Sequence, residues 1–177
     1  SIGLWEDSGF VDQGLGNIKY KHVGHYAIGA PLSPDTIQEL AGMTAIFSGT
    51  AVGSVVSAAG REAGFGNVSV QVDYANRASA DRNFWELSGF ISNSGSYIQS
   101  GETRVTLSHG EEGRYYGASS SAGIAAQVDG GVHGVYKNGG VNTLETAGAF
   151  AVNDTNNNVA ISGSYTAGNT NVSRSPD

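Results

Sequence analysis

The chain has 177 residues, with nine basic and sixteen acidic side chains, a formal net charge of −7 and no cysteine. This length suits one domain with a sizeable core, and the lack of cysteine excludes disulfides and thiolate metal sites. The acidic balance argues against nucleic acid as a partner, because no basic patch is present to release counterions. Glycine is abundant (27 residues) and charged residues make up only 14%, so the composition is typical of an all-β protein.

Residues 1–41 are expected to form a lead-in segment. Residues 1–18 carry turn signals and predict a loop with at most a short strand. Polar and apolar residues alternate over residues 19–28, which predicts a strand. The Ser-Pro pair at 33–34 supplies an N-cap and a first helical residue, so a helix of one or two turns should follow.

Residues 42–168 are expected to form the main domain, followed by a polar tail at residues 169–177. The expected strands cover residues 43–56, 67–74, 83–92, 104–108, 114–117 with an indistinct continuation to 128, the two arms of 130–152, and 159–165. About eight strands at a spacing of ~8–12 residues predict a sandwich or a barrel.

Alternation assigns faces to the two clearest strands. The residues of 67–74 expected to face inward, with Asp73 outward, are Val68, Val70, Val72 and Tyr74. The residues of 83–92 expected to share one face, opposite Phe90, are Trp85, Leu87, Gly89 and Ile91.

A hairpin is predicted over residues 130–152, with a Gly/Asn turn between its arms. Glycines also occur inside both arms, where they lower strand propensity, so they are expected to mark bends or places of close backbone approach. Such bends suit a small barrel better than a sandwich, because a closed sheet must coil sharply to meet itself.

Four pieces of the sequence, in order, resemble the C-terminal β-barrel domain of the transferrin-binding protein B-like family of bacterial surface proteins. They are Ala-Ile-Phe-Ser-Gly-Thr-Ala-Val-Gly at 45–53, Val-Ser-Val-Gln-Val-Asp-Tyr at 68–74, Gly-Val-Tyr-Lys-Asn-Gly at 134–139 with Glu-Thr-Ala-Gly-Ala-Phe at 145–150, and Val-Ala-Ile-Ser-Gly-Ser-Tyr at 159–165. The chain departs from the family pattern at Lys137, where the family usually has glycine after the aromatic residue.

The resemblance implies an eight-stranded, antiparallel, up-and-down barrel that is filled by side chains and is not an enzyme. It also implies binding loops displayed outside the outer membrane of a bacterium, on a secreted or cell-surface protein. Some relatives in this wider group bind host iron proteins, haem or complement factors. We therefore expect a monomer that binds a host or environmental protein, in nutrient (iron) acquisition or host interaction, and that requires no cofactor.

Histidine and tyrosine provide the alternative hypothesis, a haem or metal carrier, since imidazole is a common ligand of metals and haem iron. His22 and His25 are three residues apart on a predicted strand, so they could meet only if Gly24 bent the chain. With such a bend, the donor set would be Tyr20, His22, His25 and Tyr26, with His133 as a further candidate. His109 lies in an acidic turn and is expected to be solvated.

The sequence shows no catalytic constellation. Glu111 and Glu112 share a turn without an apolar pocket to raise a carboxyl pKa. The serine run at 119–121 lacks the Gly-x-Ser-x-Gly pattern of a nucleophile elbow. The Asn/Asp-rich segment 153–158 is predicted to be a plain turn rather than a calcium site.

Recognition by a filled barrel should use its loops, and three loops mix charge, tyrosine and glycine: 75–82, 92–103 and 109–114. The candidate partner-binding residues in them are Arg77, Arg82, Tyr97, Glu111, Glu112 and Arg114. A third hypothesis, an integral outer-membrane barrel, would need an apolar outer band, whereas the outward positions of 67–74 are polar.

Overall fold

The computed structural model describes residues 2–12, 17–27, 32, 34–98, 103–134, 136–137, 141–142 and 144–174, with side chains at 32, 34–98, 103–134 and 144–173. These residues form the helix α1 (Pro34–Leu40) and the strands β1 (Ile2–Asp12), β2 (Asn17–Ala27), β3 (Met43–Ser57), β4 (Gly60–Asp73), β5 (Phe84–Ser92), β6 (Gly95–Ile98), β7 (Val105–Thr106), β8 (Ser108–His109), β9 (Arg114–Ser121), β10 (Ile124–His133), β11 (Tyr136–Lys137), β12 (Val141–Asn142), β13 (Glu145–Asp154) and β14 (Val159–Arg174). The all-β prediction is confirmed, and so is the helix after the Ser-Pro pair.

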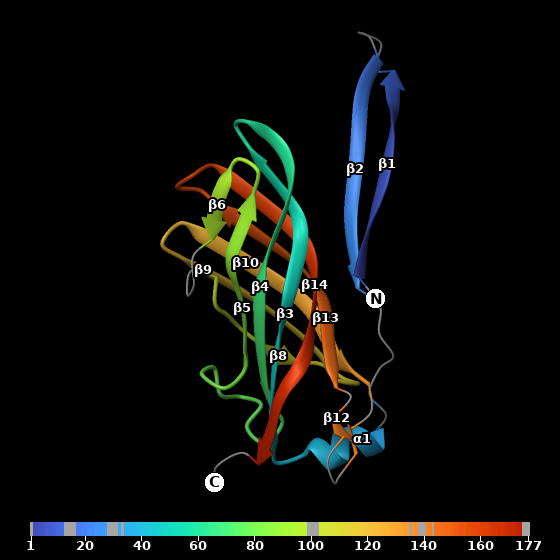
Figure 1. Cartoon of the computed structure of the whole chain (residues 1–177), viewed down its shortest axis with the longest axis vertical. Helices are drawn as coiled ribbons and strands as arrows, with labels where there is room; N and C mark the ends of the chain where they lie inside the picture. The colour runs from blue at the N-terminus through green and yellow to red at the C-terminus, as the bar shows by residue number, and fades with distance from the viewer. Residues whose placement is uncertain are drawn as a thin grey trace.

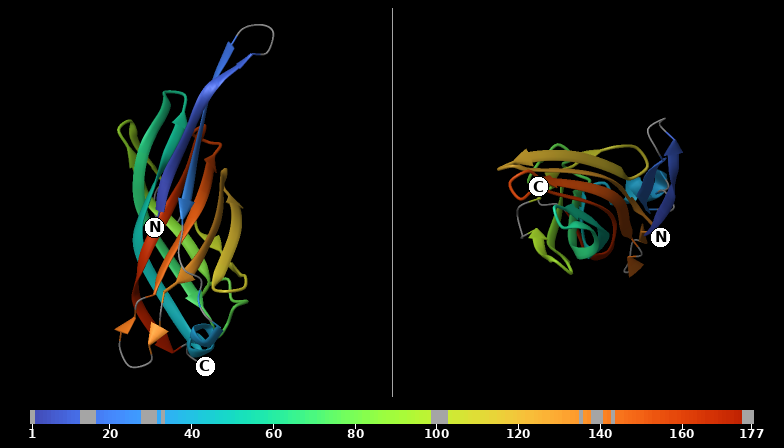
Figure 2. Two further views of the ribbon diagram at one scale, coloured as in Figure 1. Left: turned by 90° about the vertical axis from the view of Figure 1, so that its right-hand side faces the viewer. Right: turned by 90° about the horizontal axis from the view of Figure 1, so that it is seen from above.

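Ten of these strands form one curled antiparallel sheet, drawn in Figures 1 and 2. Its order is β6-β5-β4-β3-β14-β13-β10-β9-β8, and β7 pairs with β5 beside that path. The prediction of eight strands was therefore wrong. The extra strands arise because β6 folds back on β5 as a short hairpin and because Leu107 separates β7 from β8.

The concave side of the sheet is filled with large side chains. The expected inward series of the first clear strand is confirmed, since Val68, Val70, Val72 and Tyr74 are all buried. In the middle of the sheet, the Trp85 ring centroid lies 5.5 Å from that of Phe150 and 5.9 Å from that of Tyr165. This interior is packed like a core.

The pairing of the two arms of the predicted hairpin is confirmed as the antiparallel pair β10–β13, in which Gly130 lies opposite Gly148. The predicted Gly/Asn turn falls partly on residues 138–140, which lie outside the described residues. The two glycines mark a close approach, as expected. A Cβ on Gly130 would collide with the Tyr165 hydroxyl, and a Cβ on Gly148 would lie 2.5 Å from that same oxygen. The space is used by a buried hydroxyl cluster, in which the Tyr115 and Tyr165 hydroxyl oxygens are 2.5 Å apart and Tyr115 also bonds Thr146.

The faces predicted for the second clear strand hold for only half its length. Trp85 and Leu87 are buried together, but Phe90 is also buried and Ile91 is 37% exposed. The register between β4 and β5 shifts between Phe65 and Asn67, close to Gly89, which has a φ of 60°. This irregularity inserts one extra residue and reverses the alternation beyond it.

The two ends of the chain also differ from expectation. Residues 2–12, predicted to be mostly loop, form β1, which pairs with β2 along its whole length. The sequence pattern of residues 2–12 did not indicate a strand. The segment forms one because its backbone N–H and C=O groups find hydrogen-bond partners on β2. At the other end β14 continues to Arg174, which pairs with Met43, so the sheet extends beyond residue 168 into the expected polar tail. Within the described residues, no helix has the length and apolar character needed to cross a bilayer.

Candidate functional site

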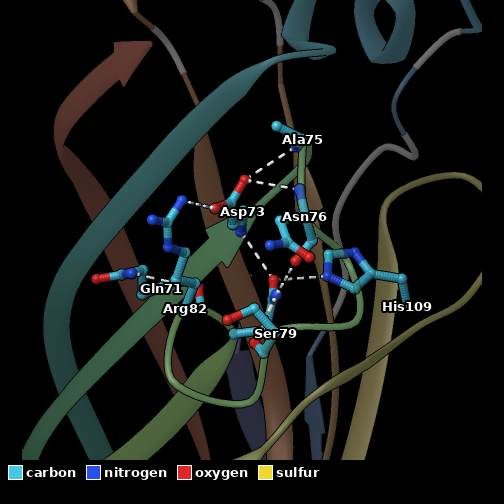
Figure 3. Close-up of polar contacts among 8 residues, drawn as sticks. Gln71, Asp73, Ala75, Asn76, Ser79, Arg82 and His109 are labelled. Carbon is cyan, nitrogen blue, oxygen red and sulfur yellow. Dashed lines mark hydrogen bonds and ion pairs between the residues drawn. The ribbon is translucent and has the colours of Figure 1, made fainter. Parts of the chain in front are cut away.

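The loop at residues 74–83, between β4 and β5, is held by a buried polar network near α1 (Figure 3). One carboxylate oxygen of Asp73 accepts hydrogen bonds from the backbone N–H groups of Ala75 (2.9 Å) and Asn76 (3.0 Å). The other carboxylate oxygen lies 3.4 Å from the Arg82 guanidinium. The Asp73 side chain was predicted to point outward, yet it is fully buried. It turns inward because it caps the loop that follows the strand, as Asp does in Asx-turns.

Asn83 is the centre of this network and is also fully buried. Its Oδ1 accepts from the Asp73 backbone N–H at 2.8 Å. Its Nδ2 donates to the carbonyl oxygens of Asn76 (2.9 Å) and Ser79 (3.0 Å). One side chain therefore joins both ends and the middle of the loop, which fixes the loop's shape.

His109, expected to be solvated, is half-buried against this network. Its Nε2 lies 2.7 Å from Asn83 Oδ1. Because Oδ1 is an acceptor, Nε2 carries the proton and donates it. Burial, and then the positive charge of Arg77, lower the pKa of His109, while the Asp73 carboxylate acts in the opposite direction. The imidazole is therefore neutral at pH 7.

A cleft of about 260 Å³ opens beside His109, and we call it the α1-end cleft. It is lined by Ile37, Tyr74, Arg77 and residues 109–113. Burial raises the pKa of the Tyr74 phenol well above its usual value. Its hydroxyl is buried without a hydrogen-bond partner among the described residues. Glu112 adopts a φ of 54°, which turns the 110–113 segment tightly along the rim.

Three of the predicted loop residues meet at this cleft, namely Arg77, Glu111 and Glu112. In the described part of the chain, none of the three makes an ion pair, so their charges are available to a partner. Arg82 lies against Asp73 beneath the loop, and Arg114 lies on the exposed outer surface, 3.4 Å from Asp129.

Tyr97 lies elsewhere, on β6 at the opposite end of the sheet (Figure 1). The three predicted loops therefore do not form one surface. Sequence reasoning missed Asn83, Tyr74 and Ile37 as parts of the site. An Asp at a strand end, three residues before Asn76, was the available signal for the capped loop.

The haem or metal candidates lie mostly on β2, whose side chains are outside the described ones. The β1–β2 ladder has no register shift, and Gly24 pairs with Trp5 within it. The ladder therefore lacks the bend at Gly24 that this ligand set would require, and positions 22 and 25 alternate to opposite faces of the ribbon. His133 is packed, with its side chain 14% exposed and its Nε2 3.6 Å from a Glu145 carboxylate oxygen.

Titration with haem tests this hypothesis. If β2 binds haem, a saturable, shifted Soret band should appear, and His22→Ala and His25→Ala should each weaken it. His109→Ala serves as the control and should leave the band unchanged, since its ring is hydrogen-bonded to Asn83. The absence of a spectral change at micromolar haem would eliminate the haem carrier.

The lowered pKa of His109 also makes stability depend on pH. The unfolded chain, with a histidine pKa of ~6.5, binds more protons than the native state below that pH. The contribution of His109 is complete above pH ~6.5 and is lost as the pH falls below it. Denaturant titrations should show a steeper acid-side loss for the wild type than for His109→Gln, which keeps a donor for Asn83. Superimposable profiles would contradict the assignment.

No protein-family model matches the sequence, and no curated protein matches it. The resemblance to transferrin-binding protein B-like barrels therefore stays a prediction.

Proposed function

We propose that this chain is a non-enzymatic binding module that captures a protein through the α1-end cleft and its rim. The observation that carries the proposal is the meeting of Arg77, Glu111 and Glu112, from two loops, around a cleft whose wall includes Ile37 of α1. Arginine beside a small apolar and aromatic wall is typical of interface hot spots, and rim charges of both signs steer one orientation of approach.

The rigidity of the 74–83 loop supports binding through this end. The loop is fastened by hydrogen bonds of the buried Asp73 and Asn83 side chains and by the ion pair of Arg82 with Asp73. Arg77 is therefore presented from a fixed backbone, which lowers the entropy lost on association.

A closed, filled barrel is the finer architecture that we propose. Support comes from the segment 105–109: Val105 pairs with Trp85 of β5, His109 pairs with Tyr115 of β9, and Leu107 between them is 3% exposed. If β7 and β8 act as one strand, this segment joins the two ends of the sheet.

The titratable groups buried in this interior belong to the hydroxyl cluster that fills it. Burial raises the pKa of the Tyr115 and Tyr165 phenols well above their usual range, so both stay protonated at neutral pH. Display on a bacterial surface or in the medium, and a role in iron acquisition or host interaction, rest on the resemblance alone. The integral membrane barrel is the competing architecture, and insolubility without detergent would support it.

Affinity capture tests the proposed function. The immobilised chain should retain a protein from host serum or culture medium, which mass spectrometry identifies. We expect the combined variant Arg77→Ala, Glu111→Ala, Glu112→Asn to bind that protein at least about tenfold more weakly, since truncated hot spots each cost on the order of 1–2 kcal/mol. Asparagine at position 112 tolerates the left-handed backbone and so removes only the charge.

The matched control is Tyr97→Ala, at the opposite end of the sheet, which should change the affinity less than about twofold. Unchanged binding by the α1-end variant would place the contact elsewhere and overturn the proposal. Failure to capture any protein from either source would also count against a protein-binding module.

A further inference from the structure

The end of the sheet opposite α1 holds a second, larger cavity. It measures about 1000 Å³ and is open to solvent. Besides Ser94 in the turn before β6, its wall carries four serines from three strands, Ser57 on β3, Ser96 on β6, and Ser119 and Ser121 on β9. We call this cavity the serine cup, defined by these four residues.

Three of the serines continue the series that points to the interior. On β3 the buried Val55 and Ser57 share a face. The β5–β6 register shifts between Ser96 and Ile98, so Ser96 does not continue the series of the buried Ile98, although it lines the cavity. On β9 the series runs from the buried Tyr115 to Ser119 and Ser121, whereas Ser120 lies on the other face. Where the middle of the sheet is filled by Trp85 and its aromatic neighbours, the wall of this end consists largely of small side chains, serines and alanines, with Tyr97 and Arg104 among the larger ones.

The cup is therefore open because of residue choice, and its size falls at the top of the ~300–1,000 Å³ range of ligand clefts. Small polar side chains at interior positions do not stabilise a core, since they bury little apolar area. Four of them around one opening provide hydrogen-bonding groups for a ligand instead.

The charged side chains of the cup already have partners. Both oxygens of the Asp154 carboxylate accept hydrogen bonds, one from the Asn156 and Asn157 backbone N–H groups and the other from the Asn157 side chain. The Arg104 guanidinium lies 3.8 Å from the centre of the Phe84 ring and donates to the Asp81 carbonyl. The groups left for a ligand are neutral.

These remaining groups are serine hydroxyls, the Asn156 side-chain oxygen, and the half-exposed ring of Tyr97. Hydroxyls both donate and accept hydrogen bonds, and a phenol offers an apolar face with a polar tip. An anionic ligand would find no free cationic side chain in the cup, because Arg104 is already engaged. An apolar ligand would leave the serine hydroxyls without hydrogen-bond partners. We propose that the serine cup binds a neutral oligosaccharide. This site is independent of the protein-binding α1-end cleft.

Nuclear magnetic resonance of the full chain tests the proposal with chitotriose, cellotriose, maltotriose and N-acetyllactosamine, and with sialyllactose as the acidic comparison. At about 1 mM sugar, which detects dissociation constants into the millimolar range, at least one neutral sugar should shift the amide resonances of Ser119, Ser121 and Asn156. The double variant Ser119→Val, Ser121→Val should weaken that binding at least about tenfold. Ser120→Val, between them on the outer face, should leave it unchanged.

Tyr97→Ala provides a second variant, at a half-exposed rim position, should the valine pair disturb folding. Tyr97→Ala should lower the affinity for the same sugar, whereas Arg77→Ala, at the far end of the sheet, should not. The proposal is overturned if no neutral sugar shifts the cup resonances, if sialyllactose binds more tightly than every neutral sugar, or if Ser120→Val weakens binding as much as the double variant. The double variant should still bind a protein partner at the α1-end cleft. Loss of sugar binding with retained protein binding therefore distinguishes a failure of the serine cup from a failure of the proposed protein-binding function.

Discussion

Replacing Gly148 with alanine should destabilise the domain by about 3 kcal/mol, at the upper end of the cost of overpacking. The added Cβ would meet the Asp129 carbonyl oxygen and lie 2.7 Å from the Gly130 Cα. Both are backbone atoms of the paired strand β10, so no side-chain rotation can relieve the contact. Chemical denaturation followed by circular dichroism measures the loss.

Gly168→Ala is the matched control on the neighbouring strand, because a Cβ there has nothing within 4 Å. It should be neutral or slightly stabilising. Gly130→Ala gives a further check, since its Cβ would collide mainly with the Tyr165 hydroxyl. Tyr165→Phe should partly rescue Gly130→Ala but not Gly148→Ala. Equal stability of the two Gly→Ala variants at 148 and 168 would contradict the close strand packing.

Asn83→Ala should cost about 3 kcal/mol as well, for a different reason. The change removes hydrogen bonds to the Asp73 N–H, the Asn76 and Ser79 carbonyls and His109. Each buried polar group left without a partner costs on the order of 1–3 kcal/mol. Amide hydrogen exchange should accelerate across residues 74–83, and affinity for an α1-end partner should fall with it.

Ser79→Ala is the control for this effect. Ser79 contributes its backbone carbonyl to Asn83, which alanine retains, so exchange in the loop should stay near the wild-type rate. An Asn83→Ala variant with unchanged stability and an equally protected loop would show that the network does not hold the loop.

The alternation of apolar and polar residues in the sequence predicted the fold class and most of the strands. Val68, Val70 and Val72 are buried as their spacing predicted, because side chains alternate across any strand. The glycines inside the β10–β13 hairpin also correctly predicted that the two backbones approach closely there. The Ser-Pro pair predicted α1, since capping is a local interaction that needs no tertiary context.

The errors arose where long-range pairing decides. Phe90 and Ile91 lie on the faces opposite to those predicted because the register of β4 and β5 shifts near Gly89, and only the pairing of the two strands reveals this shift. β1 looked like a loop until β2 paired with it. Asp73 reads as an outward polar residue in a strand, yet it is buried because Asn83 and the loop backbone surround it.

The candidate sites divide in the same way. Composition named charged loops as binding candidates, and Arg77, Glu111 and Glu112 do line one cleft. The separation of Tyr97 from them depends on strand direction, because β5 carries the chain from one end of the sheet to the other before β6 begins (Figure 1). The serine cup could not be predicted from the sequence for the same reason, because the hydroxyls on β3, β6 and β9 come together only when the sheet curls. Sequence by itself determines which side chains alternate and which turns are capped, whereas the curvature and register of the sheet decide which of them share a site.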